Sequence, residues 1–425
     1  MKGNMAMEER KVRPRGPLRG VVRVPGSKSH TQRALIVASL ADGESRIEHP
    51  LFSEDTRLLA AALRRLGAEI VEEGSGLRVR GCGGVPAVPE GEIFLGNNGT
   101  AMRFLLSVVS LGRGKYRLTG DARLCERPVG GLADALGRLG VTMEDRNGCP
   151  PVVVHAAGMR GGVAELADIR SSQFVSSLLL AAPYAAGDVV VALRGSTVSE
   201  PYIDMTVRVM ADFGVSVLRE ETNRYRVPAG QRYRGRGYRI EGDASSASYF
   251  FLAAALCGGS VRVLNVRRNG LQGDIRFLDI LESLGCRVRA GEDWIEVEGA
   301  PRDGAERSFD MGGMPDMVPT LAVLAAFRPG RTIVSRVPHL RLKESDRLSA
   351  LAVELRKIGA GVVEKEDGLT IDGGNPHGAT IETYRDHRIA MSFAVAGLAV
   401  PGMKISDPAC VTKSFPTFWE EIERL

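Results

Sequence analysis

The sequence predicts an α/β fold in which six similar repeats form two domains of three repeats each. Three observations support this prediction. A polar cluster recurs at intervals of roughly 70 residues, and each cluster runs into an Ala/Leu-rich segment typical of a helix. In the first five repeats a second, amphipathic segment ends at a glycine, the usual left-handed stop of a helix. The chain of 425 residues is too long for one ordinary core and suits two domains of about 200 residues.

The polar clusters occupy equivalent positions, each at the start of the first helix of a repeat. They are Ser29-His30-Thr31-Gln32-Arg33, Asn98-Gly99-Thr100-Ala101-Met102-Arg103, Ser171-Ser172-Gln173, Asp243-Ala244-Ser245-Ser246, Pro315-Asp316-Met317 and Asp386-His387-Arg388. The N-terminus of a helix presents unpaired N–H groups and a partial positive charge, which together favour anions. Six such positions in one molecule predict a ligand with several negative charges.

The first repeat illustrates the expected order of elements. We expect a helix over 29–40, a strand over 45–48, a second helix capped by Ser53 and ending at Leu66, and a hairpin of strands over 69–72 and 77–80. The same order returns in later repeats. Because the first helices are apolar beyond their opening turn, as in 174–182 and 249–257, we expect them to be buried on all sides. The sheets then lie outside, and the helix N-termini face a cleft.

The domain boundaries follow from the repeats. Repeats one to three fit in residues 25–239, and repeats four to six fit in 240–425. We expect residues 12–24 to form a strand pair that joins the second domain, so that this domain consists of 1–24 and 240–425. The chain would then cross twice between domains, and the active site would lie in the cleft between them.

The composition of the chain limits the classes of protein to which it can belong. The net charge of +5, with 44% hydrophobic and 25% charged residues, is that of a mildly basic globular protein, compatible with an acidic small substrate or with nucleic acid. The six cysteines lack metal or redox spacing and predict reduced, mostly buried thiols, and the scattered histidines predict no metal site. The polar N-terminus has no secretory signal, and no stretch of 18 apolar residues occurs. We therefore expect a cytoplasmic protein that does not enter a membrane.

Basic residues stand at matched places in both predicted domains. Any one of them alone is typical of a solvated surface, but the repetition predicts a shared anion site. They are Lys28 and Arg33 around the first helix cap, Arg127 after the Gly96–Thr100 loop, Lys343 and Arg347 around Glu344, Arg388 after His387, and Lys413.

Several long motifs of the chain are similar to those of the 5-enolpyruvylshikimate-3-phosphate (EPSP) synthase family. The resemblance runs from about Pro25 to Phe415, and its motifs are Pro-Gly-Ser-Lys-Ser, Gly-Asn-Asn-Gly-Thr-Ala-Met-Arg, Glu-Arg-Pro, Ser-Ser-Gln-Phe, Glu-Gly-Asp-Ala-Ser-Ser-Ala, Leu-Lys-Glu-Ser-Asp-Arg and Asp-His-Arg-Ile-Ala-Met. It implies the enolpyruvyl transferase fold, with two domains of three βαβαββ units that close on shikimate 3-phosphate and phosphoenolpyruvate. It also implies a monomer that needs no cofactor.

The same resemblance implies roles for individual residues. Asp316 would be the base, Glu344 the acid, and Lys28 the third catalytic residue. Shikimate 3-phosphate would contact Lys28, Ser29, Arg33, Ser171, Ser172, Gln173, Ser199, Tyr202, Asp316, His339 and Lys343. Phosphoenolpyruvate would contact Lys28, Asn97, Gly99, Arg127, Gln173, Glu344, Arg347, His387, Arg388 and Lys413. Two positions depart from some relatives, which have asparagine in place of His339 and proline in place of Phe104.

The reaction explains why so many cations are present. The two substrates bring roughly five to six negative charges, from two phosphates and two carboxylates. A hydroxyl adds to the enol ether, giving a tetrahedral ketal, and loss of phosphate restores the double bond. One carboxylate can serve as base and another as acid.

Two alternatives remain. The sister enzyme that acts on UDP-N-acetylglucosamine shares the repeats, but its family has a reactive cysteine where this chain has Ala122. A nucleic-acid-binding repeat protein would have basic, solvated helices along its inner surface, whereas the first helices here are apolar.

Overall fold

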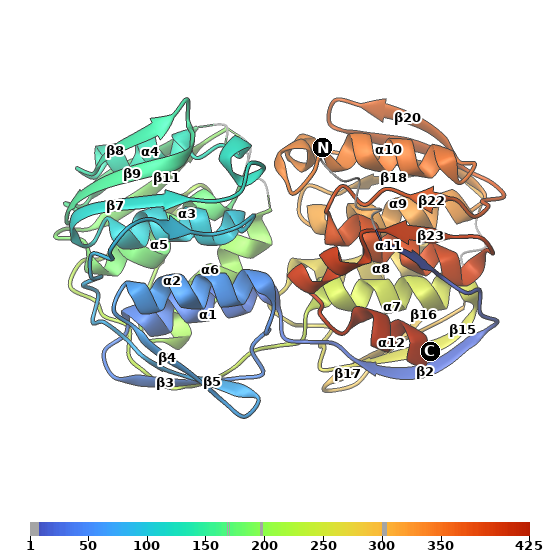
Figure 1. The fold of residues 1–425 in the computed structure, drawn as a ribbon, viewed down its shortest axis with the longest axis horizontal. Coiled ribbons are helices and arrows are strands. Elements are labelled where there is room, and N and C mark those ends of the chain that lie inside the picture. The colour runs from blue at the N-terminus through green and yellow to red at the C-terminus, as the bar shows by residue number, and fades with distance from the viewer. Residues whose placement is uncertain (1–7, 168, 170, 196–198, 300–303) are drawn as a thin grey trace, which may run out of the picture. The chain divides into compact units, whose positions relative to one another are not determined.

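The computed structural model describes residues 8–167, 169, 171–195, 199–299 and 304–425. The chain divides into two compact units (Figure 1). One unit is Gly26–Glu241, and the other combines the described part of Met1–Pro25 with Gly242–Leu425. We describe each unit by itself, because each has its own hydrophobic core.

The Gly26–Glu241 unit contains three repeats. Its helices are α1 (Lys28–Leu40), α2 (Glu54–Arg65), α3 (Gly99–Val109), α4 (Gly130–Arg138), α5 (Gln173–Ala181) and α6 (Glu200–Asp212), with 3₁₀ turns η1 (Leu124–Glu126) and η2 (Ala182–Tyr184). Its strands are β3 (Glu44–Glu48), β4 (Glu69–Glu73), β5 (Gly76–Arg80), β6 (Ile93–Phe94), β7 (Arg113–Thr119), β8 (Thr142–Arg146), β9 (Cys149–Ala157), β10 (Gly162–Ala167), β11 (Val189–Arg194), β12 (Leu218–Glu221), β13 (Arg224–Val227) and β14 (Gly237–Arg239).

The second unit contains the other three repeats. Its helices are α7 (Ala244–Cys257), α8 (Phe277–Ser283), α9 (Val318–Phe327), α10 (Arg347–Lys357), α11 (His387–Ala399) and α12 (Phe418–Arg424), with 3₁₀ turns η3 (Gly273–Arg276), η4 (Pro315–Met317), η5 (Pro338–Leu342) and η6 (Pro408–Lys413). Its strands are β1 (Glu9–Lys11), β2 (Leu18–Arg23), β15 (Gly259–Leu264), β16 (Arg287–Ala290), β17 (Trp294–Glu298), β18 (Arg307–Asp310), β19 (Gly330–Ser335), β20 (Gly361–Lys365), β21 (Gly368–Gly373), β22 (Thr380–Ile381) and β23 (Lys404–Ser406).

Five of the sheets in the described residues repeat one strand order. An edge strand runs parallel to the strand that follows the first helix, and an antiparallel hairpin completes the sheet, as in β10-β11-β13-β12 and β18-β19-β21-β20. This is the βαβαββ unit. The sixth sheet has the order β1-β23-β22, so the N-terminal strand β1 occupies the place of the hairpin.

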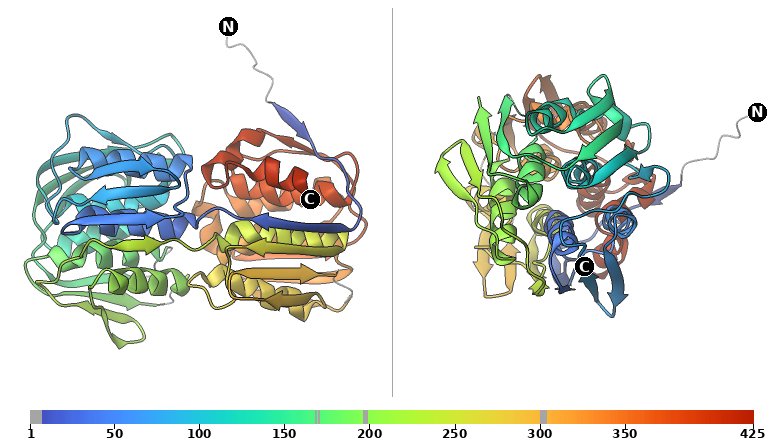
Figure 2. Two further views of the ribbon diagram at one scale, coloured as in Figure 1. Left: turned by 90° about the horizontal axis from the view of Figure 1, so that it is seen from below. Right: turned by 90° about the vertical axis from the view of Figure 1, so that its left-hand side faces the viewer.

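Two edge strands do not join the unit of the helix that follows them in the sequence. Strand β2 precedes α1 in sequence, but it pairs in parallel with β15, and the two run side by side in Figure 2. Strand β14 precedes α7, but it pairs in parallel with β3. The prediction of a strand pair over 12–24 is therefore wrong, because β1 and β2 lie in different sheets. Pro14 and Pro17 between them lack the N–H groups that a hairpin ladder needs.

The first helix of each repeat is buried, as its apolar sequence predicts. In α7 every residue from Ala244 to Ala255 is buried, and in α11 the buried stretch runs from His387 to Leu398. The second helices bury one face only, so α2 exposes Arg57 while it buries Leu59 and Leu63. The first helices therefore form the centre of each unit, and their polar opening turns are held in place by the packing of the apolar turns that follow.

The glycine stops of the second helices are confirmed. Gly67, Gly140, Gly214, Gly285 and Gly359 all have a positive φ, between +87° and +99°. An L-amino acid other than glycine adopts this left-handed conformation at a cost of roughly 1–2 kcal/mol.

We predict that Gly214→Ala lowers the free energy of unfolding of its unit by about 1–2 kcal/mol, measured by urea denaturation. The cost is conformational, because nothing lies within 4 Å of a methyl added at this glycine, whose φ is +88°. Gly137→Ala is the control: it lies in α4 of the same unit with equally open surroundings and no positive φ. A Gly214→Ala protein as stable as Gly137→Ala contradicts the prediction.

Candidate functional site

The candidate site residues of the Gly26–Glu241 unit gather at the N-termini of α1, α3 and α5. Lys28 opens α1 immediately after Ser27, whose side chain accepts a hydrogen bond from the His30 N–H. The Lys28 ammonium lies 3.2 Å from a carboxylate oxygen of Asp55, in the first turn of α2. Both side chains are largely buried, so the carboxylate holds the lysine at the start of the helix.

Arg33, one turn further along α1, is a buried cation with neutral partners. Its guanidinium donates to the hydroxyls of Thr206 at 2.7 Å and Ser176 at 3.2 Å, and to the backbone oxygens of Ser29 at 2.9 Å and Tyr202 at 3.1 Å. Burial lowers the pKa of Arg33 to about 10, so the group stays charged at neutral pH. Among the described residues no carboxylate forms an ion pair with it. An uncompensated positive charge therefore lies beneath the N-terminal turn of α1.

At the N-terminus of α3, Asn98 organises the loop and Arg127 covers it. The Asn98 side chain accepts a hydrogen bond from the Ala101 N–H at 2.9 Å and donates to the Asp55 backbone oxygen at 2.8 Å. The Arg127 guanidinium donates to Asn97 at 3.4 Å. A methyl group at Gly99 would lie 2.5 Å from the guanidinium carbon of Arg127, so only glycine leaves this space.

The N-terminus of α5 is held by polar contacts to α3. The Gln173 amide accepts from the Arg103 guanidinium at 2.5 Å and donates to the Thr100 hydroxyl at 2.9 Å. These contacts orient Gln173, a predicted binding residue. Arg103 was not among the site residues predicted from the sequence.

The remaining serines of this unit lie at two helix starts. Ser171 accepts a hydrogen bond from the Gln173 N–H at 3.3 Å, and Ser172 is buried beside it. Ser199 precedes α6 in a left-handed conformation with φ of +55°. Tyr202, in the first turn of α6, places its ring 5.9 Å from the guanidinium of Arg33.

In the second unit, Asp316 lies at the centre of a cluster of cations. One carboxylate oxygen accepts from Arg347 at 2.9 Å and lies 3.7 Å from the Lys343 ammonium, and the other accepts from Arg388 at 2.8 Å. Burial alone would raise the pKa of Asp316, but Arg388, Lys343 and Arg347 outweigh burial and hold the pKa well below its usual value. Asp316 is therefore a carboxylate whose proton affinity is set by its neighbouring cations.

Arg347 joins three carboxylates in one buried network. Besides Asp316, its guanidinium donates to Asp386 at 2.7 Å and to Glu344 at 2.8 Å. The side chains of Arg347 and Asp386 are 1% and 0% exposed, which is possible only because each neutralises the other. Asp386 also caps α11 by accepting from the Arg388 N–H, so one carboxylate positions both arginines.

A further carboxylate, Asp274, lies buried near this cluster. It accepts a hydrogen bond from the Ser245 hydroxyl at the start of α7. Burial, and after it the charge of Asp316, raises the pKa of Asp274 to about 6. The two aspartates therefore have their proton affinities pushed apart in opposite directions.

His339, in η5, is buried with only 4% of its surface exposed, and neither ring nitrogen has a hydrogen-bond partner among the described residues. Burial, and after it the charge of Lys343, lowers the pKa of His339 to about 4, so the ring is neutral at pH 7. His387, at the start of α11, and Lys413, at the end of η6, are also buried.

The comparisons with known proteins agree with one another. The family model described as EPSP synthase (3-phosphoshikimate 1-carboxyvinyltransferase) matches residues 12–422. The chain belongs to the EPSP synthase family. A relative in this family from Methanoculleus marisnigri, named 3-phosphoshikimate 1-carboxyvinyltransferase, is 47% identical over 412 residues, which cover 96% of this chain and 97% of the relative. A relative of the same name from Trichormus variabilis is 43% identical over 407 residues, or 95% of each chain.

The fold is also that of solved EPSP synthases. The structure of EPSP synthase from Acinetobacter baumannii has a TM-score of 0.80 and 29% sequence identity, with 98% of each chain covered. The predicted fold class and family are therefore confirmed. The roles of the individual site residues stay predictions.

The structure groups the predicted residues of this EPSP synthase family member in two sets, one in each unit. The first set is Lys28, Ser29, Arg33, Asn97, Gly99, Arg127, Ser171, Ser172, Gln173, Ser199 and Tyr202; the second is Asp316, His339, Lys343, Glu344, Arg347, His387, Arg388 and Lys413. The sequence reasoning missed the partners that hold these side chains, namely Asp55, Arg103 and Asp386. Two of them stood inside quoted motifs: Arg103 ends Gly-Asn-Asn-Gly-Thr-Ala-Met-Arg, and Asp386 opens Asp-His-Arg.

Other possible sites were tested in the described residues. They contain no group of three or more His, Cys, Asp or Glu side chains arranged to hold a metal ion. The described helices include none long and apolar enough to cross a membrane. The six cysteines are unpaired. Cys286 is buried in the core of the second unit, and Cys82, Cys257 and Cys410 are partly buried and pack against the two cores, as the prediction of mostly core thiols requires. Cys125 in η1 and Cys149 at the start of β9 do not belong to either core.

The burial of His30 leads to a pH-dependent stability. Its ring contacts the Tyr238 hydroxyl at 2.7 Å, and burial, and after it Arg33, lowers the pKa of His30 to about 3. The unfolded chain binds a proton near pH 6.5, whereas the folded protein does not. The stability from this group is therefore present above pH 6.5 and is lost as pH falls toward 3.

We predict that His30→Gln, which keeps a hydrogen-bonding side chain, flattens the loss of stability on acidification. Between about pH 7 and pH 5 the free energy of unfolding should fall less steeply than in the wild type, by up to about 1.4 kcal/mol per pH unit. Urea denaturation followed by circular dichroism measures both slopes. Ser39→Ala, at a buried residue of the same helix whose side chain does not titrate in this range, is the control and should keep the wild-type slope. Equal slopes for His30→Gln and the wild type would contradict the assignment.

Proposed function

We infer that the protein transfers the enolpyruvyl group of phosphoenolpyruvate to the 5-hydroxyl of shikimate 3-phosphate and releases phosphate, a step of aromatic amino acid biosynthesis. Family membership over residues 12–422 supports this activity. The observation that carries the mechanism is the Asp316 cluster, in which a partly buried carboxylate is surrounded by Arg347, Arg388 and Lys343. The reaction needs a base at the attacking hydroxyl, an acid at the methylene carbon and cations for the leaving phosphate.

We propose that both sets of residues contribute to the binding of the two substrates. Phosphoenolpyruvate would contact the basic residues Arg127, Arg347, Arg388 and Lys413 together with Lys28, Asn97, Gly99, Gln173, Glu344 and His387. Shikimate 3-phosphate would contact Ser29, Arg33, Ser171, Ser172, Ser199 and Tyr202 together with Lys28, Gln173, Asp316, His339 and Lys343. The uncompensated charge of Arg33 supports this arrangement, because an anion near the start of α1 would neutralise it.

Asp316 is the proposed base. With its three cationic neighbours it holds a proton weakly, because they keep its pKa low. When the phosphate and carboxylate of phosphoenolpyruvate engage Arg347 and Arg388, these cations are shared with the substrate and their pull on Asp316 weakens. The proton affinity of Asp316 then rises toward the range that general-base catalysis needs. Base strength would therefore be greatest when the substrate is bound.

Glu344 is the proposed acid, and Lys28 assists. Glu344 contacts Arg347 at 2.8 Å and its side chain is 10% exposed, so it keeps access to a ligand. Protonation of the methylene carbon makes the adjoining carbon electrophilic, and the hydroxyl adds to it to form the tetrahedral ketal. Loss of a proton from the methyl group and departure of phosphate restore the double bond. Lys28, at the first turn of α1, supplies positive charge to the departing group.

His339 is proposed to contact shikimate 3-phosphate with a neutral ring. A buried imidazole with two unpartnered nitrogens can offer one donor and one acceptor to a ligand. A phosphate at this position would satisfy the donor, in the way that an asparagine amide does. The replacement of asparagine by histidine is therefore compatible with the proposed contact.

We further propose that the protein acts as a cytoplasmic monomer without a nucleic-acid partner. Both proposed substrates are phosphorylated small molecules. The two units that contribute the proposed binding residues belong to a single chain, as a monomer requires. The two rival functions receive less support, because the curated relatives cited above are named 3-phosphoshikimate 1-carboxyvinyltransferase. Phosphate release with shikimate 3-phosphate, compared with UDP-N-acetylglucosamine as the acceptor, tests the substrate.

We predict that Asp316→Asn lowers kcat by at least about a hundredfold while shikimate 3-phosphate binding changes little. Asparagine keeps the shape of the side chain but cannot take the hydroxyl proton. Phosphate release measures kcat, and calorimetry measures binding. Asp372→Asn is the matched control, since Asp372 also pairs with an arginine, Arg331, but lies at the surface. Wild-type turnover in Asp316→Asn would remove this residue from the mechanism.

We also predict that Gly99→Ala raises the KM for phosphoenolpyruvate about tenfold. The added methyl would clash with the Arg127 guanidinium and push it from its place beside Asn97. Displacement of a ligand-binding group of this kind is worth roughly 1–3 kcal/mol. The KM for shikimate 3-phosphate should change much less. Gly137→Ala, with open space around the new methyl, is the control. An unchanged phosphoenolpyruvate KM would exclude Arg127 from that subsite.

A further inference from the structure

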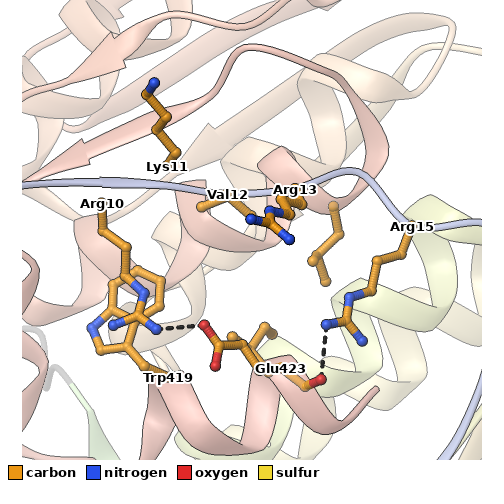
Figure 3. A pocket seen from close by; sticks show the side chains of 9 residues that line it. Arg10, Lys11, Val12, Arg13, Arg15, Trp419 and Glu423 are labelled. Carbon is orange, nitrogen blue, oxygen red and sulfur yellow. Dashed lines mark hydrogen bonds and ion pairs between the residues drawn. The ribbon is translucent and has the colours of Figure 1, made fainter.

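A cavity of about 540 Å³ lies in the second unit, away from the residues assigned to the reaction (Figure 3). It is formed between the N-terminal segment 10–15, which begins in β1, and the C-terminal helix α12. Its floor includes Leu398, near the end of α11, whereas Arg388 stands at the start of that helix. Ten residues of α-helix separate the two by about 15 Å along the axis. The cavity is therefore a separate place from the Asp316 cluster.

The walls of the cavity carry an excess of positive charge. Four cations, Arg10, Lys11, Arg13 and Arg15, line it together with one carboxylate, Glu423. Arg10 donates to the Glu423 carboxylate and Arg15 donates to its backbone oxygen at 2.8 Å, and Figure 3 shows both arginines converging on Glu423. Neither Lys11 nor Arg13 forms an ion pair with a described carboxylate. The single acidic group is thus already engaged, and net positive charge is left for a ligand.

The rest of the lining is apolar. The indole of Trp419 donates to the Pro408 backbone oxygen at 2.9 Å, and the Arg10 guanidinium lies 4.7 Å from the ring centre. Leu398 and Ile422 are buried beneath the same cavity. An apolar floor with cations at the rim matches a ligand that has a ring at one end and an anionic group at the other.

We propose that this cavity binds a small organic anion, with an aromatic body against Trp419 and a phosphate or carboxylate between Arg13 and Arg15. The bound anion joins the N-terminal segment to α12. Since that segment also pairs with β23 through β1, occupancy holds together elements from both ends of the chain. The site is independent of the proposed reaction, and its test does not require activity.

The test uses Trp419 as its own reporter. Trp294 and Trp419 are the two tryptophans of the sequence, so Trp294→Phe leaves a single fluorophore in the cavity. Phenyl phosphate is the probe. In this variant we expect a saturable change in emission with phenyl phosphate, a weaker response to inorganic phosphate, which lacks the ring, and none with benzyl alcohol, which lacks the charge. Benzoate in place of phenyl phosphate shows which anionic group the site prefers.

Three added variants decide whether the cavity is responsible. Arg13→Ala removes a cation without a described ion pair and should weaken phenyl phosphate binding, and Arg13→Ala with Arg15→Ala should weaken it at least about tenfold. Arg19→Ala with Arg23→Ala removes the same charge from exposed positions on β2 and should leave the affinity within about twofold. The proposal is overturned by an unsaturable signal, by equal binding of benzyl alcohol, or by equal affinity loss in the two double variants.

Discussion

The chemistry of the second unit depends on the burial of one guanidinium, that of Arg347. A cation removed from water must regain the interactions that hydration supplied, and here the carboxylates of Asp316, Glu344 and Asp386 supply them. The planar fork of the guanidinium fixes the direction of each contact. Asp316 and Glu344, the proposed base and acid, are therefore held by the same rigid group, although they lie before different helices, α9 and α10.

The two units treat their buried cations differently. Arg347 is neutralised within the protein, whereas Arg33 meets hydroxyls and backbone oxygens only, as far as the described residues extend. Neutral acceptors orient Arg33 without cancelling its charge. One unit thus offers a fixed, uncompensated cation for an anionic substrate, and the other offers carboxylates whose proton affinity responds to the charge around them. In the proposed scheme cations of both units bind anions, but the proposed base and acid belong to the second unit only.

Local features could be predicted from the sequence, and non-local pairings could not. The glycine stops, such as Gly214, follow from a leucine-bearing turn, and the buried first helices follow from their uninterrupted apolar residues. The partner of a buried charge depends on which segments meet in the fold. Arg347 and Asp386 are 39 positions apart, and both resemble ordinary helix-start residues. For the same reason Asp55, which holds Lys28, carried no signal beyond that of a first-turn acid.

The exchange of edge strands shows why the N-terminal residues count as part of the second unit. Strand β2 supplies the parallel edge beside β15, and β1 supplies the antiparallel partner of β23. Without these strands, two of the three sheets of that unit would present unpaired backbone groups. The segment between them, with Arg13 and Arg15, is fixed at both ends by sheet pairing, and the Arg15 N–H also donates to the Leu398 oxygen at 2.8 Å. Sheet pairing at both ends of the segment therefore holds its cations over α12, where they form the rim of the basic cavity.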